Sequence, residues 1–277
     1  MIEILAPAKI NLFLRVCGKN TAGFHLLDSL VAFTEFGDRM TIEPASEDKL
    51  ILTGDFGNQL KVEEEKNLVL LALDAFRSAG GTFCHLRITL EKRIPISAGL
   101  GGGSTDAAAL LQTLNEHSDN PLSENQMYQI ALKLGADVPV CLKGGCQRVA
   151  NIGQTMKPHN LPKMAAVLLI NPRKRLSTSD VFKRFEDPMS GYAGSLATLG
   201  VTALVGLGND LTKTAVSLVP EIDLILKRLA NTNGLITAAM TGSGASCFAF
   251  FNNIGNAKKA AKKMQTIGFW AKVSQIY

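Results

Sequence analysis

The most informative stretch of this sequence is Pro95-Ile-Ser-Ala-Gly-Leu-Gly-Gly-Gly-Ser-Thr-Asp-Ala-Ala108, a run of glycines that opens an apolar helix. A strand is predicted before it, because Leu86, Ile88 and Leu90 alternate with polar residues. Successive glycines let backbone N–H groups converge without a Cβ clash, and a helix start adds free N–H groups and a partial positive charge. The stretch therefore predicts a cradle for an anion such as a polyphosphate.

Four other kinds of functional loop do not match this stretch. A Walker A loop needs Lys and then Ser or Thr directly after its last glycine, whereas Gly103 is followed by Ser104 and Thr105. A Rossmann fingerprint that starts at Gly99 needs Gly or Ala where Ser104 stands. A protein-kinase glycine loop needs a catalytic-loop signature that this sequence lacks, and neither Ser104 nor Ser243 is the centre of a Gly-x-Ser-x-Gly elbow.

Two further motifs lie far from the glycine-rich stretch along the chain. Residues 6–12 read Ala-Pro-Ala-Lys-Ile-Asn-Leu, and residues 240–246 read Met-Thr-Gly-Ser-Gly-Ala-Ser. In this order the three motifs resemble those of the GHMP small-molecule kinases. The resemblance implies an α+β, two-lobed GHMP kinase fold, with a ribosomal-S5-like N-terminal ATP lobe, a C-terminal α/β sandwich lobe and the active site in the cleft. We expect residues 1–157 to form the N-terminal ATP-binding and catalytic domain and residues 158–277 the C-terminal domain.

Two shorter motifs narrow the resemblance to one branch of this family. They are Gly23-Phe-His25 and Leu134-Gly-Ala-Asp-Val-Pro139. The branch phosphorylates the 2-hydroxyl of a cytidine diphosphate-linked methylerythritol in non-mevalonate isoprenoid precursor synthesis. The resemblance therefore implies ATP and Mg²⁺ as cofactors and this small molecule as the acceptor. The modest net charge and the absence of a long apolar run predict no nucleic acid and no membrane as partners.

The resemblance assigns the catalytic roles to Lys9 and Asp137. Asp137 is expected to accept the proton of the acceptor hydroxyl, and Lys9 to keep that carboxylate ionised and to offset negative charge near the phosphoryl group. A weak base suffices, because in a loose transition state the nucleophile keeps its proton until late. By spacing alone, a turn residue is the better interpretation of Asp137. For Lys9, which lies in an otherwise apolar strand, the alternative is a lysine that reaches solvent at a strand edge.

The expected ATP-binding residues gather in and around the glycine-rich stretch. They are Pro95, Gly99, Leu100, Gly101, Gly102, Gly103, Ser104, Thr105, Asn67 and Lys92. The resemblance places the last two near the nucleobase of ATP. The metal ligands are not identified by the sequence, and Ser104 is the one candidate. Asp106 is expected to act as a helix cap or first-turn acid.

The expected acceptor-binding residues come from several motifs. They are Asn11, Phe24, His25, Phe182, Gly242 and Ser243. The resemblance implies that the two Phe side chains stack on cytosine and that His25 reads its edge. Core packing is the alternative for both Phe residues, and a structural hydrogen bond is the alternative for Asn11. Many relatives carry Glu after Gly153, where this chain has Gln154.

Hydrophobic periodicity predicts the remaining elements. Strands are expected at residues 1–16, 30–36, 40–42, 50–53, 86–90, 165–170, 235–240, 247–251 and 269–276. Those at residues 30–36, 40–42 and 50–53 are expected to be antiparallel. Helices are expected at residues 66–78, 107–114, 178–186, 195–205, 219–231 and 256–266. Ser123 and Gln126 predict a capping box for a further helix that ends at Gly135, and residues 136–140 are expected to form a turn or short strand.

Composition limits the remaining functional classes. The chain has 277 residues, a formal net charge of +5 and five widely spaced cysteines, and its N-terminus does not resemble a secretory signal. We expect a cytoplasmic protein with reduced thiols that is a monomer or weak homodimer. Two alternatives stay open at this point, another GHMP kinase acting on homoserine or a mevalonate-pathway substrate, and a non-catalytic RNA-binding module.

Residues 258–263 carry four lysines on a helix face that we expect to be solvated.

Overall fold

The computed structural model describes residues 1–60 and 67–277, and the chain forms two compact units. Unit 1 comprises residues 1–8, 37–96 and 101–144, and unit 2 comprises residues 9–36, 97–100 and 145–277. The units are therefore not successive stretches of chain, because strands β1 (Ile2–Lys19) and β2 (His25–Pro44) contribute to both. The domain boundary expected between residues 157 and 158 is a different kind of division, and it stays a prediction.

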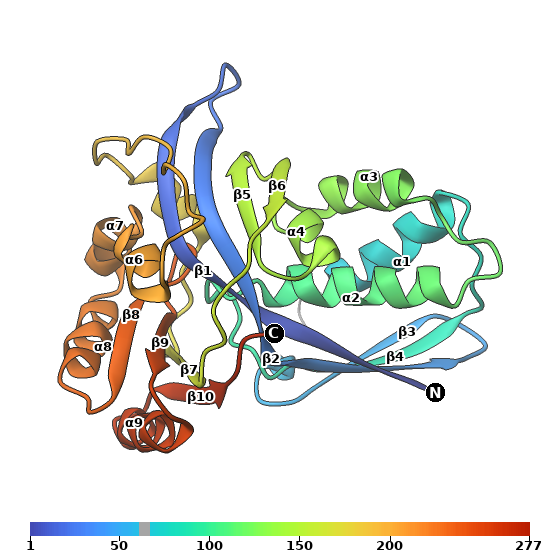
Figure 1. Cartoon of the computed structure of the whole chain (residues 1–277). Coiled ribbons are helices and arrows are strands. Elements are labelled where there is room, and N and C mark those ends of the chain that lie inside the picture. The colour runs from blue at the N-terminus through green and yellow to red at the C-terminus, as the bar shows by residue number, and fades with distance from the viewer. Residues whose placement is uncertain (61–66) are drawn as a thin grey trace. The chain divides into compact units, whose positions relative to one another are not determined.

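Unit 1 contains a small sheet with helices on one face (Figure 1). The end of β2 pairs with β4 (Leu86–Glu91) in antiparallel fashion, and β3 (Lys49–Thr53) pairs with β4 in parallel. The antiparallel arrangement predicted for residues 50–53 is therefore wrong. The helical segments of the unit are η1 (Gly57–Gln59), α1 (Leu68–Ser78), α2 (Gly102–Glu116), α3 (Glu124–Leu134) and α4 (Val138–Lys143).

The core of unit 1 lies between this sheet and α1 and α2. The apolar sides of β2, β4 and both helices supply fully buried residues such as Met40, Ile88, Phe76 and Leu110. The capping box of Ser123 and Gln126 is present, as predicted.

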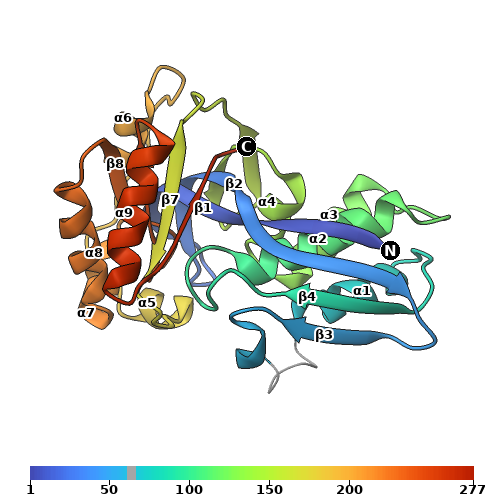
Figure 2. The same ribbon diagram turned by 90° about the horizontal axis from the view of Figure 1, so that it is seen from below.

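Unit 2 contains a four-stranded antiparallel sheet in the order β10-β7-β9-β8. Its strands are β7 (Ala166–Asn171), β8 (Leu235–Met240), β9 (Cys247–Phe251) and β10 (Trp270–Ser274). Every residue of β7 and β9 is buried, so these strands form the centre of the sheet. Figure 2 shows α8 (Glu221–Ala230) and α9 (Ile254–Thr266) together on one face, with α8 against β8 and β9 and α9 against β7, β9 and β10.

The rest of unit 2 surrounds the first half of β2, residues 25–36. Residues 27–31 pair with β5 (Gln147–Asn151), which pairs with β6 (Thr155–Pro158). The other helices are α5 (Thr178–Lys183), α6 (Val201–Gly206) and α7 (Thr212–Leu218). Strands β5 and β6 and helix α7 are elements that periodicity did not predict.

Three predicted elements are corrected by the structure. Of the helix predicted at residues 195–205, only the part from Val201 onward is helical, in α6. Residues 136–140 form no strand, because α4 starts at Val138 and carries Pro139 in its first turn, where a missing backbone N–H removes no helical bond. The predicted helix 107–114 begins earlier, at Gly102, so two glycines of the glycine-rich stretch lie in its first turn. The strands predicted at residues 235–240 and 247–251 are confirmed.

No helix in the described ranges is both long enough and apolar enough to cross a membrane. All five cysteines are free, as expected. Burial raises the pKa of the Cys17 thiol to about 11 and that of Cys146 to about 12, so both thiols stay protonated and are poor nucleophiles at neutral pH.

Candidate active site

The first turn of α2 supplies the predicted anion cradle within unit 1. Gly101 occupies the N-cap position with a φ of 68°, a backbone conformation that favours glycine, and no side chain caps the helix. The backbone N–H groups of Gly102, Gly103 and Ser104 receive no acceptor from the described part of the chain. Three N–H groups at the positive end of a 15-residue helix are suited to bind phosphate oxygens.

The glycine at position 102 lies close to side chains in the interior of unit 1. A Cβ at this position would lie 3.2 Å from Ile94 Cγ2 and 3.4 Å from Asp38 Oδ2. At Gly103 a Cβ would meet only Leu68 Cδ1, at 3.5 Å. The first residue of α2 therefore packs directly on Ile94 and Asp38, and a larger side chain there would displace the helix start.

Lys92 lies beneath this helix start rather than at the surface. Its side chain is 4% exposed, and its ammonium group contacts Asp38 Oδ2 and, at 2.6 Å, Asp106 Oδ2. We call Lys92, Asp38 and Asp106 the buried triad. The role expected for Asp106, a helix cap or first-turn acid, is wrong, because Asp106 lies in the second turn of α2 and points to Lys92.

The buried triad connects three elements next to the cradle. Asp38 belongs to β2, Asp106 to α2, and Lys92 follows β4. Asp38 Oδ1 also accepts the backbone N–H groups of Arg93 and, at 2.8 Å, Ile94. The triad therefore fixes both the approach to the glycine-rich stretch and the helix that leaves it.

The triad holds two carboxyl groups for one ammonium group. Asp106 Oδ1 is buried without a hydrogen-bond partner among the described residues. Burial raises the pKa of Asp106 to about 8, with Lys92 opposing this shift and Asp38 adding to it. A protonated Asp106 makes the triad neutral, which suits a buried site.

Asn67, expected near the nucleobase, caps a helix. Its Oδ1 atom accepts the backbone N–H of Val69 at 3.0 Å, at the N-terminus of α1. This capping bond satisfies one of the N–H groups that the helix start leaves unpaired.

The two glycine motifs of unit 2 pack against each other. Gly99 has a φ of 74°, and a Cβ there would lie 2.5 Å from the carbonyl oxygen of Thr241 and 2.7 Å from that of Gly244. A Cβ at Gly242 would lie 2.8 Å from the carbonyl oxygen of Gly99. The Ser246 N–H donates to the Ala98 carbonyl at 3.1 Å. Both loops therefore need glycine because their backbones touch.

The N-terminal motif joins this pair of loops through backbone and side-chain bonds. The Lys9 N–H donates to the Leu100 carbonyl at 2.9 Å, and the Asn11 N–H donates to Thr241 Oγ1 at 2.8 Å. Residues from all three motifs that carried the family resemblance thus lie in direct contact within unit 2.

The Lys9 side chain is buried, with 3% of the residue exposed. Its Nζ atom donates to Asn11 Oδ1 at 3.1 Å, and Asn11 Nδ2 donates to Ser29 Oγ at 2.8 Å. A buried ammonium group is a strong hydrogen-bond donor and is suited to bind an anion. The alternative of a lysine that reaches solvent at a strand edge does not fit this burial.

Asp137 belongs to unit 1 and is exposed. It occupies the N-cap position of α4, but its carboxylate makes no capping hydrogen bond to that helix. Helix capping therefore does not account for an acid at this position.

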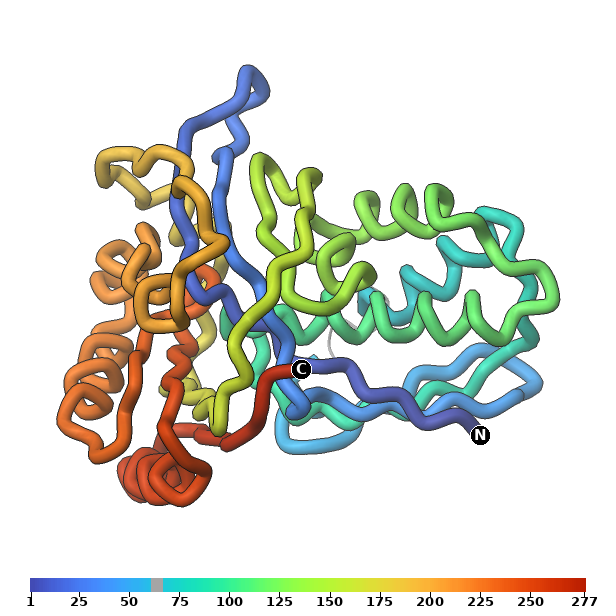
Figure 3. The backbone as a smooth tube through the Cα atoms, in the orientation of Figure 1, coloured from blue at the N-terminus to red at the C-terminus, as the bar shows by residue number. Residues whose placement is uncertain are grey.

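Figure 3 shows the hairpin between β1 and β2 in blue. Phe24 is the last residue of its turn, and His25 is the first residue of β2. Asn20 Oδ1 accepts the Phe24 N–H at 2.9 Å and so orders the turn. The Phe24 residue is 64% exposed, which excludes the alternative of core packing for this side chain.

The His25 ring lies on Phe182, with ring centroids 5.0 Å apart and planes at 30°, and meets Phe185 edge-on at 6.0 Å. Burial, with Lys19 adding to it, holds the pKa of His25 below its usual value, so the ring is neutral at pH 7. Its Nε2 atom is buried without a partner among the described residues. A neutral, unpartnered ring nitrogen beside an exposed aromatic residue is suited to read the edge of a heterocyclic base. Phe182, which is half-buried, both packs on the core and stacks on His25.

Gly242 and Ser243, expected to bind the acceptor, have structural contacts in unit 2. The Gly242 carbonyl accepts Asn209 Nδ2 at 2.8 Å. The hydroxyl groups of Ser243 and Thr178 lie 2.8 Å apart.

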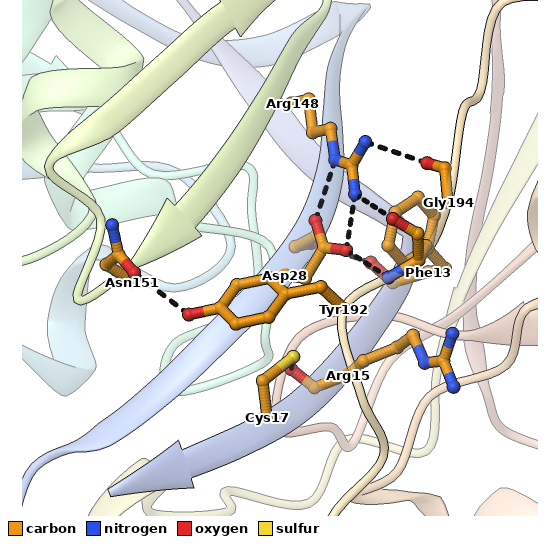
Figure 4. A network of polar contacts seen from close by, with 10 residues as sticks. Phe13, Arg15, Cys17, Asp28, Arg148, Asn151, Tyr192 and Gly194 are labelled. Carbon is orange, nitrogen blue, oxygen red and sulfur yellow. Dashed lines mark hydrogen bonds and ion pairs between the residues drawn. The ribbon is translucent and has the colours of Figure 1, made fainter. Parts of the chain in front are cut away.

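A further polar network was not found from the sequence. Asp28, fully buried on β2, accepts two hydrogen bonds from Arg148 of β5, at 2.9 and 2.8 Å, and one from the Ala193 N–H at 2.7 Å. Figure 4 shows the Arg148 guanidinium between this carboxylate and the carbonyl group of Gly194. The network fixes the segment around Ala193 on β2. Asp28 lies outside the strand predicted at residues 30–36, and the one sign of it in the sequence is an acid among leucines.

Comparison with known proteins identifies the family. The model of the GHMP kinase N-terminal domain matches residues 67–145, and that of the GHMP kinase C-terminal region matches residues 192–268. A 4-diphosphocytidyl-2-C-methyl-D-erythritol kinase of Chelativorans sp. is 40% identical over 269 residues, covering 94% of this chain and 90% of the relative. The kinase of the same name from Cereibacter sphaeroides is 41% identical over 283 residues, covering 98% and 97%.

Solved structures agree with this assignment. A crystal structure of 4-(cytidine 5'-diphospho)-2C-methyl-D-erythritol kinase has a TM-score of 0.80 and 30% identity, with 99% of each chain covered. A homoserine kinase from Cytophaga hutchinsonii, with a TM-score of 0.69 and 21% identity over 98% of this chain and 93% of that one, shares the fold. The chain therefore belongs to the 4-diphosphocytidyl-2-C-methyl-D-erythritol kinases, a family within the GHMP kinases.

Proposed function

We propose that this chain transfers the γ-phosphoryl group of ATP to the 2-hydroxyl of 4-diphosphocytidyl-2-C-methyl-D-erythritol, a step of isoprenoid precursor synthesis. Family membership carries this proposal, since relatives at about 40% identity that match nearly the whole chain bear this name. The contact between the three kinase motifs in unit 2 supports it.

The chemistry needs a new bond from the acceptor oxygen to the γ-phosphorus while the bond from that phosphorus to the β-phosphate oxygen breaks and ADP leaves. We assign Asp137 as the group that takes the hydroxyl proton. Lys9 offsets the charge on the transferring phosphoryl group through its buried ammonium. The N–H groups of Gly102, Gly103 and Ser104 bind phosphate oxygens of ATP.

The residues present fit a magnesium ion that is held mainly by the nucleotide. The Ser104 hydroxyl, in the first turn of α2, has no hydrogen-bond partner among the described residues, and these contain no group of three or more His, Cys, Asp or Glu that could hold a metal. We therefore propose Ser104 as the protein ligand of Mg²⁺, which would neutralise phosphate charge when bound.

For the acceptor we propose that Phe24 stacks on the cytosine ring and that His25 bonds to its edge. The 64% exposure of Phe24 and the unpartnered Nε2 atom of His25 support these roles. Phe182 then acts by supporting the imidazole ring from its other face. Asn11, whose amide bonds Lys9 and Ser29, is placed to act on the lysine.

We also propose that the chain works in the cytoplasm, as a monomer or weak homodimer, without a nucleic-acid partner. The five free cysteines are consistent with a reducing compartment.

The test is release of ADP from Mg-ATP by the purified chain, with and without the named acceptor. Acceptor-dependent ADP and a phosphorylated product are expected. Homoserine and mevalonate serve as control acceptors, and turnover with either in place of the cytidine compound would contradict the proposal. Salt-dependent RNA binding without ATP affinity would favour the RNA-binding alternative. Asp137→Asn is expected to abolish turnover while ATP binding, measured by calorimetry, is retained.

A further inference from the structure

Ser29 lies on β2 and is connected to the proposed catalytic lysine through Asn11. Ser29 and Lys9 are both buried, with 3% of each exposed. Ser29 Oγ donates its single proton to the Phe13 carbonyl at 2.6 Å, because a carbonyl oxygen can only accept. Toward Asn11, 2.8 Å away, the hydroxyl oxygen of Ser29 can therefore act only as an acceptor.

This polarity determines how the Asn11 amide is turned. The end of the amide that faces Ser29 must be the NH₂ group, so the carbonyl end faces Lys9 Nζ at 3.1 Å. If the amide were rotated by 180°, its NH₂ group would point at the ammonium group, and two donors would face each other in a buried site. The Asn11 backbone is itself fixed by Thr241 Oγ1, so only the amide torsion is left for Ser29 to set.

We propose that Ser29 is a positioning residue for phosphoryl transfer, acting through the orientation of the Asn11 amide on the Lys9 ammonium group. The proposal rests on the role that the proposed function gives to Lys9. It makes Ser29 part of the site although its hydroxyl is turned to the Phe13 carbonyl and the Asn11 amide.

Steady-state kinetics of Ser29→Ala, Asn11→Ala and the double variant test this relay. Ser29→Ala is expected to lower kcat about 10- to 100-fold and to change KM for ATP and for the acceptor less than about threefold. Because Ser29 acts only through Asn11, the double variant is expected to have the kcat of Asn11→Ala within about twofold. Multiplicative losses would mean that Ser29 acts by another route, and an unchanged kcat in Ser29→Ala would overturn the proposal.

Matched variants separate positioning from general loss of structure. Thr34→Val removes another buried hydroxyl of β2, which donates to the Phe36 carbonyl at 2.7 Å and has no contact with Asn11, and it is expected to keep kcat. Ser29→Thr keeps the hydroxyl and is expected to keep kcat within about threefold. Ser29→Cys keeps the size but accepts hydrogen bonds poorly, so it is expected to lose activity like Ser29→Ala even if the alanine variant does not fold.

The variant Lys9→Ala distinguishes a failure of the proposed catalytic role of Lys9 from a failure of the positioning role proposed for Ser29. If Lys9→Ala keeps full activity, the proposed role of Lys9 is wrong, and Ser29 cannot promote phosphoryl transfer by orienting Asn11 on Lys9. If Lys9→Ala is inactive while Ser29→Cys is fully active and folded, only the relay is refuted.

Discussion

Replacing Asp106 by asparagine is expected to stabilise the protein at neutral pH, although it removes one partner of a buried ion pair. The reason is the excess of carboxyl groups in the buried triad and the unpartnered Oδ1 atom of Asp106. Burial raises the pKa of Asp106 to about 8, so this side chain is neutral in the folded protein at pH 7 but ionised in the unfolded chain. Asparagine has the same shape and needs no proton to be neutral.

The magnitude follows from the pKa difference between the two states. At pH 7 the folded protein must keep a proton on a carboxyl whose ordinary pKa is 3.8, about 3 units below the working pH, and each unit is worth about 1.4 kcal/mol. Asp106→Asn is therefore expected to raise the free energy of unfolding by at most about 4 kcal/mol. Loss of the carboxyl contact with Lys92 reduces this gain.

The titration of Asp106 sets the direction in which the free energy of unfolding changes with pH. Because the folded state binds more protons than the unfolded state between about pH 4 and 8, the stability of the unmodified protein is expected to fall as the pH rises through this window. The contribution of Asp106 is fully present below about pH 4 and lost above about pH 8. The difference between Asp106→Asn and the unmodified protein should be smallest at pH 5 and largest at pH 9.

Urea denaturation at pH 5, 7 and 9 measures these differences, with Asp38→Asn as the matched control. Asp38 accepts the Arg93 and Ile94 N–H groups as well as Lys92, so its loss is expected to destabilise the protein by about 3–5 kcal/mol. If Asp106→Asn destabilises by as much as Asp38→Asn at all three pH values, Asp106 is ionised in the folded protein and the reasoning is wrong.

Three further predictions concern unit 2. Gly99→Ala is expected to lower the free energy of unfolding, measured in urea, by about 3 kcal/mol or more, because strain at φ 74° adds to a clash with the Thr241 carbonyl. The control Gly23→Ala, with φ 85° and nothing within 4 Å of the added Cβ, should cost about 1 kcal/mol, and equal losses would contradict the packing argument. His25→Ala should raise KM for the cytidine substrate at least tenfold and leave the ATP affinity unchanged, and parallel losses in both would count against a role in reading the base. Arg148→Met leaves Asp28 buried without its cation and should cost about 3 kcal/mol and expose residues 190–197 to limited proteolysis; an unchanged cleavage rate would argue against the anchoring role.

The elements that could be predicted are those whose pattern is local. Residues 235–240 and 247–251 are short apolar runs bounded by turn residues, and both are strands with the predicted bounds. Residues 136–140 were expected to form a turn or short strand; residues 136 and 137 form a turn, but Val138 and Pro139 start a helix that is too short to show a periodic pattern. The parallel pairing of β3 with β4 was also missed, since strand direction depends on which strand becomes the neighbour.

The site residues also divide into those that belong to one local motif and those whose partners are distant in the sequence. Phe24 and His25 share one short motif, and the structure places them together at a hairpin tip. The family resemblance implied a position near the nucleobase for Lys92, and the structure shows it bonded to carboxyl groups 54 and 14 residues away. No local pattern distinguishes a lysine that faces a ligand from one that faces two buried carboxyl groups, because burial is set by distant parts of the chain.

The glycine motifs show why separate stretches of sequence can identify one site. Gly99 and Gly242 are 143 positions apart, yet a Cβ on either one would meet the backbone of the other's loop. Their glycines are required by this mutual approach, whatever phosphate contacts the loops also make. The Lys9 N–H bond to Leu100 and the Asn11 N–H bond to Thr241 attach the N-terminal motif to the same two loops. The three motifs therefore occur together because they are parts of one packed structure that holds Lys9, and a substitution that separates the loops should impair the site without altering any residue that contacts substrate.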